Sequence, residues 1–210
     1  SVQQTTDGGY IIAGYTWSFG AGIQDVYLIM TSTNGDTLWT KTFGGTESDK
    51  AFSVQQTSDD GYVIAGWTNS FGSGSSDVYL IKTDANGNSI WTKTYGGIYD
   101  DLGESVQQTT DSGYIVAGYT HPQGLEASDI YLVKTDTNGD SLWAKIYEHP
   151  RYDFGYSVQQ TYDGRYIIAG IADYADVYLI KTNMNGDTIW TKTYGDIGSD
   201  WAYSIQQTFD

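Results

Sequence analysis

Residues 53–68 read SVQQTSDDGYVIAGWT, and residues 77–96 read DVYLIKTDANGNSIWTKTYG. The same text recurs along the chain: SVQQT begins at Ser1, Ser53, Ser105 and Ser157, and SIQQT begins at Ser204. These starts are 52, 52, 52 and 47 residues apart. A fixed period of this size is typical of propellers and solenoids, in which each repeat is one supersecondary unit that buries its apolar faces against its neighbours.

Four segments of each repeat have the composition of short β-strands. In the second repeat they are residues 53–57, 61–68, 77–83 and 89–96, which are rich in β-branched and aromatic residues and bounded by Gly, Asp, Asn or Ser. Asn86-Gly87 joins the last two and is the strongest short-range hairpin signal. Because no segment has a sustained 3.6-residue apolar period, the repeat predicts an antiparallel meander without a helix.

The third strand is apolar on both faces, as in Val78-Tyr79-Leu80-Ile81, and this predicts a sheet that is covered on both sides. Such sheets, packed radially, are the blades of a β-propeller. We therefore predict an all-β fold: a β-propeller built from four-stranded antiparallel blades, with four full repeats plus the first strand of a fifth. The predicted domain is a single β-propeller domain or propeller fragment over residues 1–210. Its repeats are residues 1–52, 53–104, 105–156 and 157–203, with a partial repeat at 204–210.

The fifth copy of the first strand bears on the number of blades. Residues 204–208 have the same role as residues 1–5, and both cannot be the innermost strand of one blade. Either the chain is a fragment of a propeller with roughly five to eight blades, or one copy is displaced where the ring closes. We favour the fragment.

Each first strand is short and carries two glutamines, which favours the innermost place in the blade, next to a central channel. The residues concerned are Gln3, Gln4, Gln55, Gln56, Gln107, Gln108, Gln159, Gln160, Gln206 and Gln207. A hub of amides could bind a polar ligand, or the amides could bond to one another and to water. We favour the second hypothesis because buried amides need hydrogen-bond partners in any case.

Composition limits the classes of partner. The 210 residues include 10 Lys plus Arg against 26 Asp plus Glu, a formal net charge of −16. Such a surface repels phosphate backbones and anionic lipids, so nucleic acid is not an expected partner. No apolar run reaches the ~20 residues of a membrane-spanning helix, so membrane insertion is not expected. The chain has no cysteine, which excludes disulfides, thiolate metal sites and cysteine nucleophiles.

The sequence of the repeats resembles that of a known protein family. Residues 1–16 (SVQQTTDGGYIIAGYT), residues 77–97 (DVYLIKTDANGNSIWTKTYGG) and the recurring aspartate before SVQQT resemble tandem-repeat β-propeller proteins secreted by bacteria and archaea. The resemblance spans the whole chain and implies an extracellular or cell-surface localisation, often within a multidomain protein. It supplies no catalytic residues. The period is longer than the ~40 to 45 residues of WD repeats, which match poorly.

Aspartates recur four residues before each first strand, at Asp49, Asp101, Asp153 and Asp200. A carboxylate at the same place in every blade could form calcium sites. We favour another role, in which the side chain accepts backbone N–H bonds and holds the turn between blades. A structural motif must repeat in each blade, whereas a functional site usually breaks the symmetry. No cofactor is predicted, and calcium stays open as a candidate.

Candidate ligand-binding residues lie where the repeats diverge. The loop between the second and third strands varies most, and loops on a rigid scaffold often carry function. The candidates in divergent segments are Trp17, Phe19, Phe71, Tyr99, His121, Tyr152 and Trp201. The aromatics that repeat strictly, such as Trp39 and Trp91, are instead expected to pack between blades.

Catalysis finds little support. The only histidines are His121 and His149, both in divergent loops, so no histidine pair or Cys-His arrangement exists. We therefore predict no enzymatic activity, but a non-enzymatic extracellular or cell-surface structural or interaction scaffold. The alternative is a carbohydrate-binding, lectin-like propeller with aromatic-acidic pockets. A glycan-active enzyme is the third choice, because abundant Asp and Glu could supply a carboxylate pair. The expected partners are a protein or a glycan at the cell surface, with self-association as a further option.

Overall fold

The structure is a computed structural model that describes residues 1–121, 127–148, 151–173 and 175–208. It contains four sheets, each with four antiparallel strands in sequence order, which we call blades 1 to 4. Blade 1 comprises β1 (Val2–Gln4), β2 (Tyr10–Thr16), β3 (Asp25–Thr31) and β4 (Thr37–Phe43). Blade 2 comprises β5 (Asp49–Gln56), β6 (Tyr62–Thr68), β7 (Asp77–Thr83) and β8 (Ser89–Tyr95). Blade 3 comprises β9 (Asp101–Gln108), β10 (Tyr114–Thr120), β11 (Asp129–Thr135) and β12 (Ser141–Tyr147), and blade 4 comprises β13 (Phe154–Gln160), β14 (Tyr166–Ala172), β15 (Asp176–Thr182) and β16 (Thr188–Tyr194).

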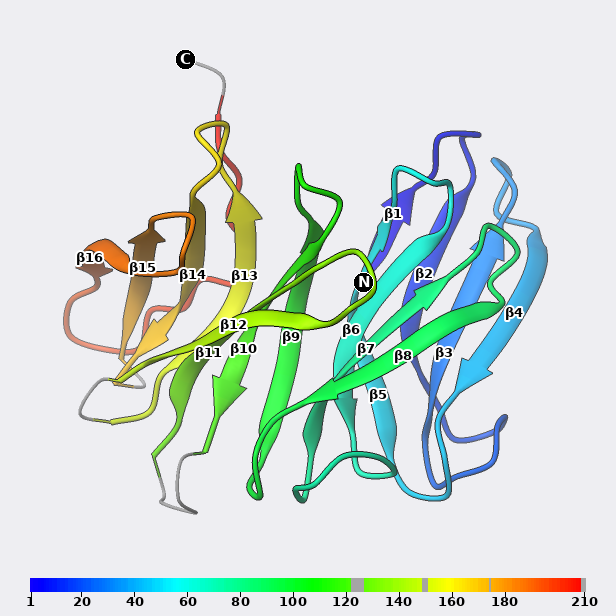
Figure 1. The fold of residues 1–210 in the computed structure, drawn as a ribbon, viewed down its shortest axis with the longest axis horizontal. Coiled ribbons are helices and arrows are strands. Elements are labelled where there is room, and N and C mark those ends of the chain that lie inside the picture. The colour runs from blue at the N-terminus through cyan, green and yellow to red at the C-terminus, as the bar shows by residue number, and fades with distance from the viewer. Residues whose placement is uncertain (122–126, 149–150, 174, 209–210) are drawn as a thin grey trace.

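The blades stand side by side in sequence order, from blue blade 1 to orange blade 4 in Figure 1. The second strand of each blade contacts the first strand of the next, as in β2 against β5, β6 against β9 and β10 against β13. This propeller-like arrangement confirms the predicted all-β fold with four-stranded antiparallel blades. Over the described residues the four sheets do not close into a ring.

The first strands are longer than predicted. β5 and β9 begin at Asp49 and Asp101, so each starts four residues before SVQQT and has eight residues. The ladder of β5 with β6 runs from Asp49↔Thr68 to Gln56↔Tyr62, with a register shift between Ala51 and Ser53. The four residues before SVQQT, which the sequence analysis left outside the predicted strands, are therefore part of the first strand. The bulge interrupts the two-residue alternation, so this segment does not read as a strand in the sequence.

A glycine in each of blades 2 to 4 lets the first strand approach the second at this bulge. A Cβ atom on Gly66 would lie 1.8 Å from the carbonyl oxygen of Lys50, and one on Gly118 would lie 1.7 Å from that of Leu102. Gly170 has the same relation to Phe154, at 1.8 Å. Gly14 in blade 1 has nothing within 4 Å of its Cβ position, since β1 begins only at Val2.

Three apolar clusters fill the spaces between neighbouring blades. An indole ring of the fourth strand meets a phenol of the next blade's second strand in each of them, with ring centroids 5.9 Å apart for Trp39 and Tyr62 and 5.7 Å apart for Trp91 and Tyr114. The pair Trp143 and Tyr166 repeats this contact at 5.9 Å. The prediction that these tryptophans pack between blades is thus confirmed.

The hub glutamines join blades through the backbone. The Gln3, Gln55 and Gln107 Oε1 atoms accept hydrogen bonds from the N–H groups of Gln56, Gln108 and Gln160, at 2.6, 2.6 and 2.5 Å. The second glutamine of the first strand accepts a hydrogen bond from the main chain of the preceding blade. In this way Ser58 N–H of blade 2 donates to Gln108 Oε1 of blade 3 at 2.8 Å. The expected bonds among the amides themselves are replaced by bonds to the neighbouring main chain.

Residues 204–208 occupy the position of a fifth first strand. The Gln207 N–H donates to Gln159 Oε1 at 2.6 Å, and the Ile205 N–H donates to Ser157 Oγ at 3.2 Å, as in the blades before. Within the described part of the chain no second strand pairs with this segment. The predicted partial repeat is therefore placed as a first strand but is not part of a sheet.

Replacing Gly118 with alanine tests the close approach at the bulge. The new methyl group would overlap the Leu102 carbonyl, so we expect Gly118→Ala to lower the free energy of unfolding by about 3 kcal/mol or more. Urea unfolding followed by tryptophan fluorescence measures this loss. The matched control is Gly97→Ala, whose methyl group meets nothing within 4 Å and should change stability by less than about 0.5 kcal/mol. Equal losses in the two variants would contradict this account of the bulge.

Candidate functional site

The two ends of the blades differ in construction. One end, which we call the turn face, carries the turns between first and second strands and between third and fourth strands. The other, the loop face, carries the variable loops between second and third strands and the connections between blades. Pockets lie at blade junctions on both faces, where side chains of two neighbouring blades meet.

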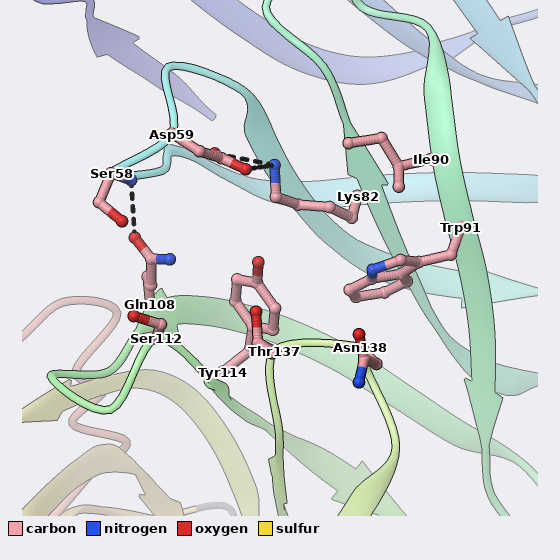
Figure 2. Close-up of a pocket in the computed structure, with 10 residues that line it drawn as sticks. All are labelled: Ser58, Asp59, Lys82, Ile90, Trp91, Gln108, Ser112, Tyr114, Thr137 and Asn138. Atoms are coloured by element: carbon pink, nitrogen blue, oxygen red, sulfur yellow. Dashed lines mark hydrogen bonds and ion pairs between the residues drawn. The ribbon is translucent and has the colours of Figure 1, made fainter.

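One pocket on the turn face lies between blades 2 and 3 and has a volume of about 360 Å³. We call it the Trp91 pocket. It is lined by Ser58, Asp59, Lys82, Ile90, Trp91, Gln108, Ser112, Tyr114, Thr137 and Asn138. Figure 2 shows these side chains coming from several strands and turns and converging on one space. The volume is at the lower end of the ~300 to 1,000 Å³ of small-molecule sites.

An ion pair forms one wall of the Trp91 pocket. Lys82 Nζ lies 2.9 Å from Asp59 Oδ2 and also donates to the Thr83 carbonyl at 2.8 Å, although the lysine side chain is almost fully buried. Burial alone would raise the pKa of Asp59, but hydrogen bonds from Thr57 and Lys82 and the lysine charge lower it below its usual range. Asp59 is therefore a fixed carboxylate beside a fixed ammonium group (Figure 2).

The opposite wall of the pocket is formed by aromatic and amide side chains. Trp91 meets Tyr114 edge to face, at an interplanar angle of 66°. Burial, and then the charge of Asp59, raises the pKa of Tyr114 to about 12, so the phenol stays protonated. Gln108 is held by the bond from Ser58 N–H, which leaves its amide nitrogen as a donor toward the pocket. The pocket thus presents a carboxylate, an ammonium group, amides and an indole within one small space.

A related pocket of about 380 Å³ lies at the junction of blades 1 and 2. Trp39, Tyr62, Asp7 and Gln56 repeat the lining of the Trp91 pocket, but Met30 stands where Lys82 stands in blade 2. Met30 is buried and packs in the apolar cluster. The same geometry therefore appears with a lysine–aspartate pair at one junction, and with methionine in place of the lysine at the other.

On the loop face the predicted candidates are spread over several sites. Trp17 is among the most exposed large side chains of the chain. Phe19 stacks on Tyr27 with ring centroids 5.7 Å apart, and Phe71 packs on Tyr79 at 5.8 Å. The loop phenylalanines thus have a packing role on the third strand, while part of each ring faces solvent.

Two other candidates meet in a loop-face pocket of about 390 Å³ between blades 2 and 3. Tyr99 and His121 line it together with the buried Asp101. The Nδ1 atom of His121 is buried and has no hydrogen-bond partner among the described residues. Residues 122–126, which follow His121, lie outside the described residues.

The remaining candidates are apart from these pockets. Tyr152 is half-buried and precedes β13. Trp201 is exposed and occupies the place that Lys50 and Leu102 hold in the first strands of blades 2 and 3, so it belongs to the repeat after all. His149 lies outside the described residues.

The recurring aspartates accept hydrogen bonds, and these explain why an aspartate stands at the same position in each repeat. Asp49 is fully buried and accepts hydrogen bonds from Gly45 N–H at 2.8 Å, from Ser70 Oγ at 2.7 Å and from Thr68 Oγ1. Asp101 accepts from Gly97 N–H in the same way, at 2.7 Å. These bonds match the turn-holding role that we favoured. Among the described residues no group of three or more His, Asp or Glu side chains is arranged to hold a metal ion, and Asp200 is exposed.

Sequence reasoning did not find the Trp91 pocket, because its residues are scattered over two repeats. One signal was present: β7 and β11 each carry a lysine, Lys82 or Lys134, inside an otherwise apolar strand. A buried lysine needs a paired charge. Asp59 and Asp111, 23 residues earlier in each repeat, are those charges, at 2.9 Å in both cases.

Comparison with known proteins finds similarity in fold. A protein of unknown function from Bacteroides caccae superposes with a TM-score of 0.56 and 13% identity over 87% of this chain and 56% of that chain. Sqt1 from Chaetomium thermophilum aligns with a TM-score of 0.49 and 11% identity, over 94% of this chain and 50% of that chain. The chain therefore spans about half the length of either structure. No protein-family model and no curated protein matches the sequence. At 13% identity the first likeness shows the fold alone.

Glu104 stands where Phe52 and Tyr156 stand in the neighbouring first strands, and burial raises its pKa from 4.5 to about 7. A raised pKa in the folded state means that the protonated form favours folding. Its contribution is complete below the unfolded pKa and is lost as the pH rises through 7. We expect Glu104→Gln to be as stable as wild type near pH 4.5 but more stable at pH 8, by on the order of 2 to 3 kcal/mol.

Urea unfolding at several values of pH between 4.5 and 8 measures this difference. The control is Glu47→Gln on an exposed connection, which should leave the slope of stability against pH unchanged. Parallel curves for wild type and Glu104→Gln would show that Glu104 is not the group responsible.

Proposed function

We propose that this chain is a non-enzymatic interaction scaffold of propeller blades, which acts outside the cell or at the cell surface. The observation that supports a binding role is the recurrence of a pocket of similar size at successive blade junctions on the turn face, lined by Lys82 in one and by Met30 at the same place in the other. A rigid array of junctions with varied lining chemistry is suited to binding. The extracellular setting rests on the sequence resemblance.

The protonation states in the Trp91 pocket favour binding over catalysis. A general acid or base works best when its pKa lies near the working pH. In this pocket the pKa of Asp59 is lowered and that of Tyr114 is raised to about 12, so both are moved away from neutrality. Glu104, whose pKa is about 7, does not line the Trp91 pocket.

A second candidate function, carbohydrate binding, is favoured by the chemistry of the Trp91 pocket. Sugars present hydroxyl groups around apolar C–H faces, so their sites combine an aromatic ring with carboxylate and amide groups. Trp91, Asp59 and Gln108 bring these three kinds of group together within one cavity of about 360 Å³. The buried Lys82 ammonium group holds the Asp59 carboxylate in place as an acceptor for sugar hydroxyl groups. This supports the lectin alternative, with the site at the junction and not in the variable loops.

Lys82→Met tests the carbohydrate hypothesis, because blade 1 carries methionine at the same place in a folded blade. On a glycan array we expect binding of neutral saccharides, and by calorimetry we expect Lys82→Met to weaken it at the Trp91 pocket at least tenfold, because Asp59 loses the ammonium group that holds its carboxylate. Gln108→Ala should weaken it through the loss of an amide donor. Thermal melts of each variant confirm folding.

The matched control is Trp17→Ala, an exposed loop-face residue. It should bind as wild type does. No binding to any saccharide would contradict the carbohydrate hypothesis while leaving a protein-binding scaffold open to test. Binding that is lost in Trp17→Ala but kept in Lys82→Met would place the site on the loop face and contradict the assignment to the Trp91 pocket.

A further inference from the structure

The junction between blades 3 and 4 repeats the ion pair of the Trp91 pocket. Lys134 Nζ lies 2.9 Å from Asp111 Oδ2 and donates to the Thr135 carbonyl at 2.8 Å, which are the distances found for Lys82 at the junction before. The lysine side chains of the two pairs are 3% and 4% exposed, while both aspartate side chains are 58% exposed. In each pair a buried ammonium group therefore holds a carboxylate that solvent can reach.

The turn between the first and second strands fixes this carboxylate as well. Asp111 Oδ1 accepts hydrogen bonds from Thr109 Oγ1 at 2.5 Å and from Gly113 N–H at 3.0 Å, and Asp59 has the same two partners one repeat earlier. Burial acts to raise the pKa of Asp111, but the bonds from Thr109 and Lys134 and the lysine charge lower it below its usual range. Asp111 is therefore an oriented, charged acceptor.

The aromatic and amide wall is repeated too. The ring centroids of Trp143 and Tyr166 are 5.9 Å apart, at an interplanar angle of 62°. Thr110 N–H donates to Gln160 Oε1 at 2.8 Å, as Ser58 N–H donates to the glutamine of the Trp91 pocket. The Gln160 amide nitrogen donates one N–H to the Gly164 carbonyl at 3.4 Å, which leaves its second N–H as a donor. The junction thus presents an indole ring, an amide donor and a carboxylate together.

The rims of the two junctions differ. Ser112 and Thr137 line the Trp91 pocket, and Gly164 and Met184 stand at these places one repeat later. Met184 is 63% exposed, and its Sδ atom lies 3.3 Å from the position of a Cβ atom on Gly164. The two junctions therefore share the groups that bond to hydroxyl-rich ligands, while the surface beside them is more apolar between blades 3 and 4.

The junction between blades 1 and 2 differs from both at one position. Asp7 accepts from Thr5 Oγ1 at 2.5 Å and from Gly9 N–H at 3.2 Å, like the other two aspartates, but Met30 takes the place of the lysine. Among the described residues, the junctions of blades 2 and 3 and of blades 3 and 4 therefore share the complete set of groups. The first junction shows that methionine at the lysine position is compatible with a folded blade.

We propose that the junction of blades 3 and 4 is a second saccharide site, equivalent to the Trp91 pocket, and that the chain binds a polysaccharide built from one repeating neutral unit. This inference rests on the proposed carbohydrate function. We call the second site the Trp143 site, and it comprises Asp111, Lys134, Trp143, Gln160 and Tyr166.

The strand register supports this class of ligand. Lys134 lies opposite Trp143 across β11 and β12, just as Lys82 lies opposite Trp91 across β7 and β8. Successive junctions thus present the same groups in the same order along the blades. A ligand whose own groups repeat engages both sites at once, and its second contact then forms at a high effective concentration. A polysaccharide of one unit has this property, whereas a single monosaccharide does not.

Calorimetric titration with a neutral disaccharide, the one with the strongest signal on the glycan array, counts the sites. We expect two sites in wild type. In Lys134→Met one of them should weaken at least about tenfold, because Asp111 loses its ammonium partner, while the other keeps its dissociation constant. Lys82→Met should have the same effect at the other site, and the double variant should weaken both. Thermal melts confirm folding, and Gln160→Ala is a second variant that should weaken only the Trp143 site.

The converse variant is Met30→Lys, which supplies the lysine at the junction of blades 1 and 2. It should raise the number of sites from two to three, because Asp7, Trp39 and Gln56 already line a pocket there. A single site that weakens in Lys82→Met and is intact in Lys134→Met would overturn the second site and leave the carbohydrate function in place. No binding of any saccharide would contradict both.

Binding to an immobilised polysaccharide of the same unit tests the repeating ligand. We expect Lys134→Met and Lys82→Met each to raise the apparent dissociation constant at least about tenfold, although each keeps one intact site, because simultaneous engagement is lost. The control is Trp17→Ala on the loop face, which should bind as wild type does. Polysaccharide binding by Lys134→Met that equals wild type would overturn the proposed repeating ligand.

Discussion

The close approach of two main chains at one glycine underlies the rest of this structure. In blades 2 to 4 the first strand bulges toward the second, and its carbonyl oxygen occupies the space in which any other residue would carry a Cβ atom. The bulge allows one strand to serve two purposes along its length. Its first half pairs at the loop face with the end of the second strand, while its second half, VQQ, lines the hub and bonds through glutamine side chains to the blades on either side. Each blade is therefore tied to its neighbours by the strand that begins it.

The junction between blades also explains where ligand chemistry can vary. Its centre is an apolar cluster with a fixed indole and phenol pair, and substitutions there would disturb the packing of two blades at once. The rim on the turn face is less constrained. Lys82 with Asp59 in blade 2 and Met30 in blade 1 occupy equivalent places without a change of strand register. A repeat protein can in this way change the chemistry of one pocket while it keeps the geometry of all of them.

Much of the fold could be predicted from the sequence because its signals are local. Asn86-Gly87 fixes a hairpin turn, and the apolar run Val78–Ile81 indicates a strand covered on both faces. The extension of the first strand to Asp49 could not be predicted in this way. Its residues, Asp-Lys-Ala-Phe, begin with two charges and contain a bulge, and they pair only because Gly66, fifteen residues further on, leaves room for them.

The candidate site was harder to predict than the fold. Variation between repeats pointed to the loop face, where Trp17 is exposed and where Phe19 and Phe71 pack on the third strand. The Trp91 pocket is instead assembled from repeated residues of two blades, such as Asp59 and Gln108, which are 49 positions apart in the sequence. Their proximity depends on how one blade is set against the next, and no local pattern carries that information.

The central claim is that the first strand of each blade, bulged against a glycine of the second strand, ties that blade to its neighbours. Hydrogen–deuterium exchange, compared between wild type and Gly118→Ala, tests it most directly. We predict faster exchange in residues 101–108 of the variant and at the amides of Ser58, Val158 and Gln160, which donate to side chains of that strand from the blades on either side. The account would be contradicted if exchange at these three amides were the same in the variant as in wild type.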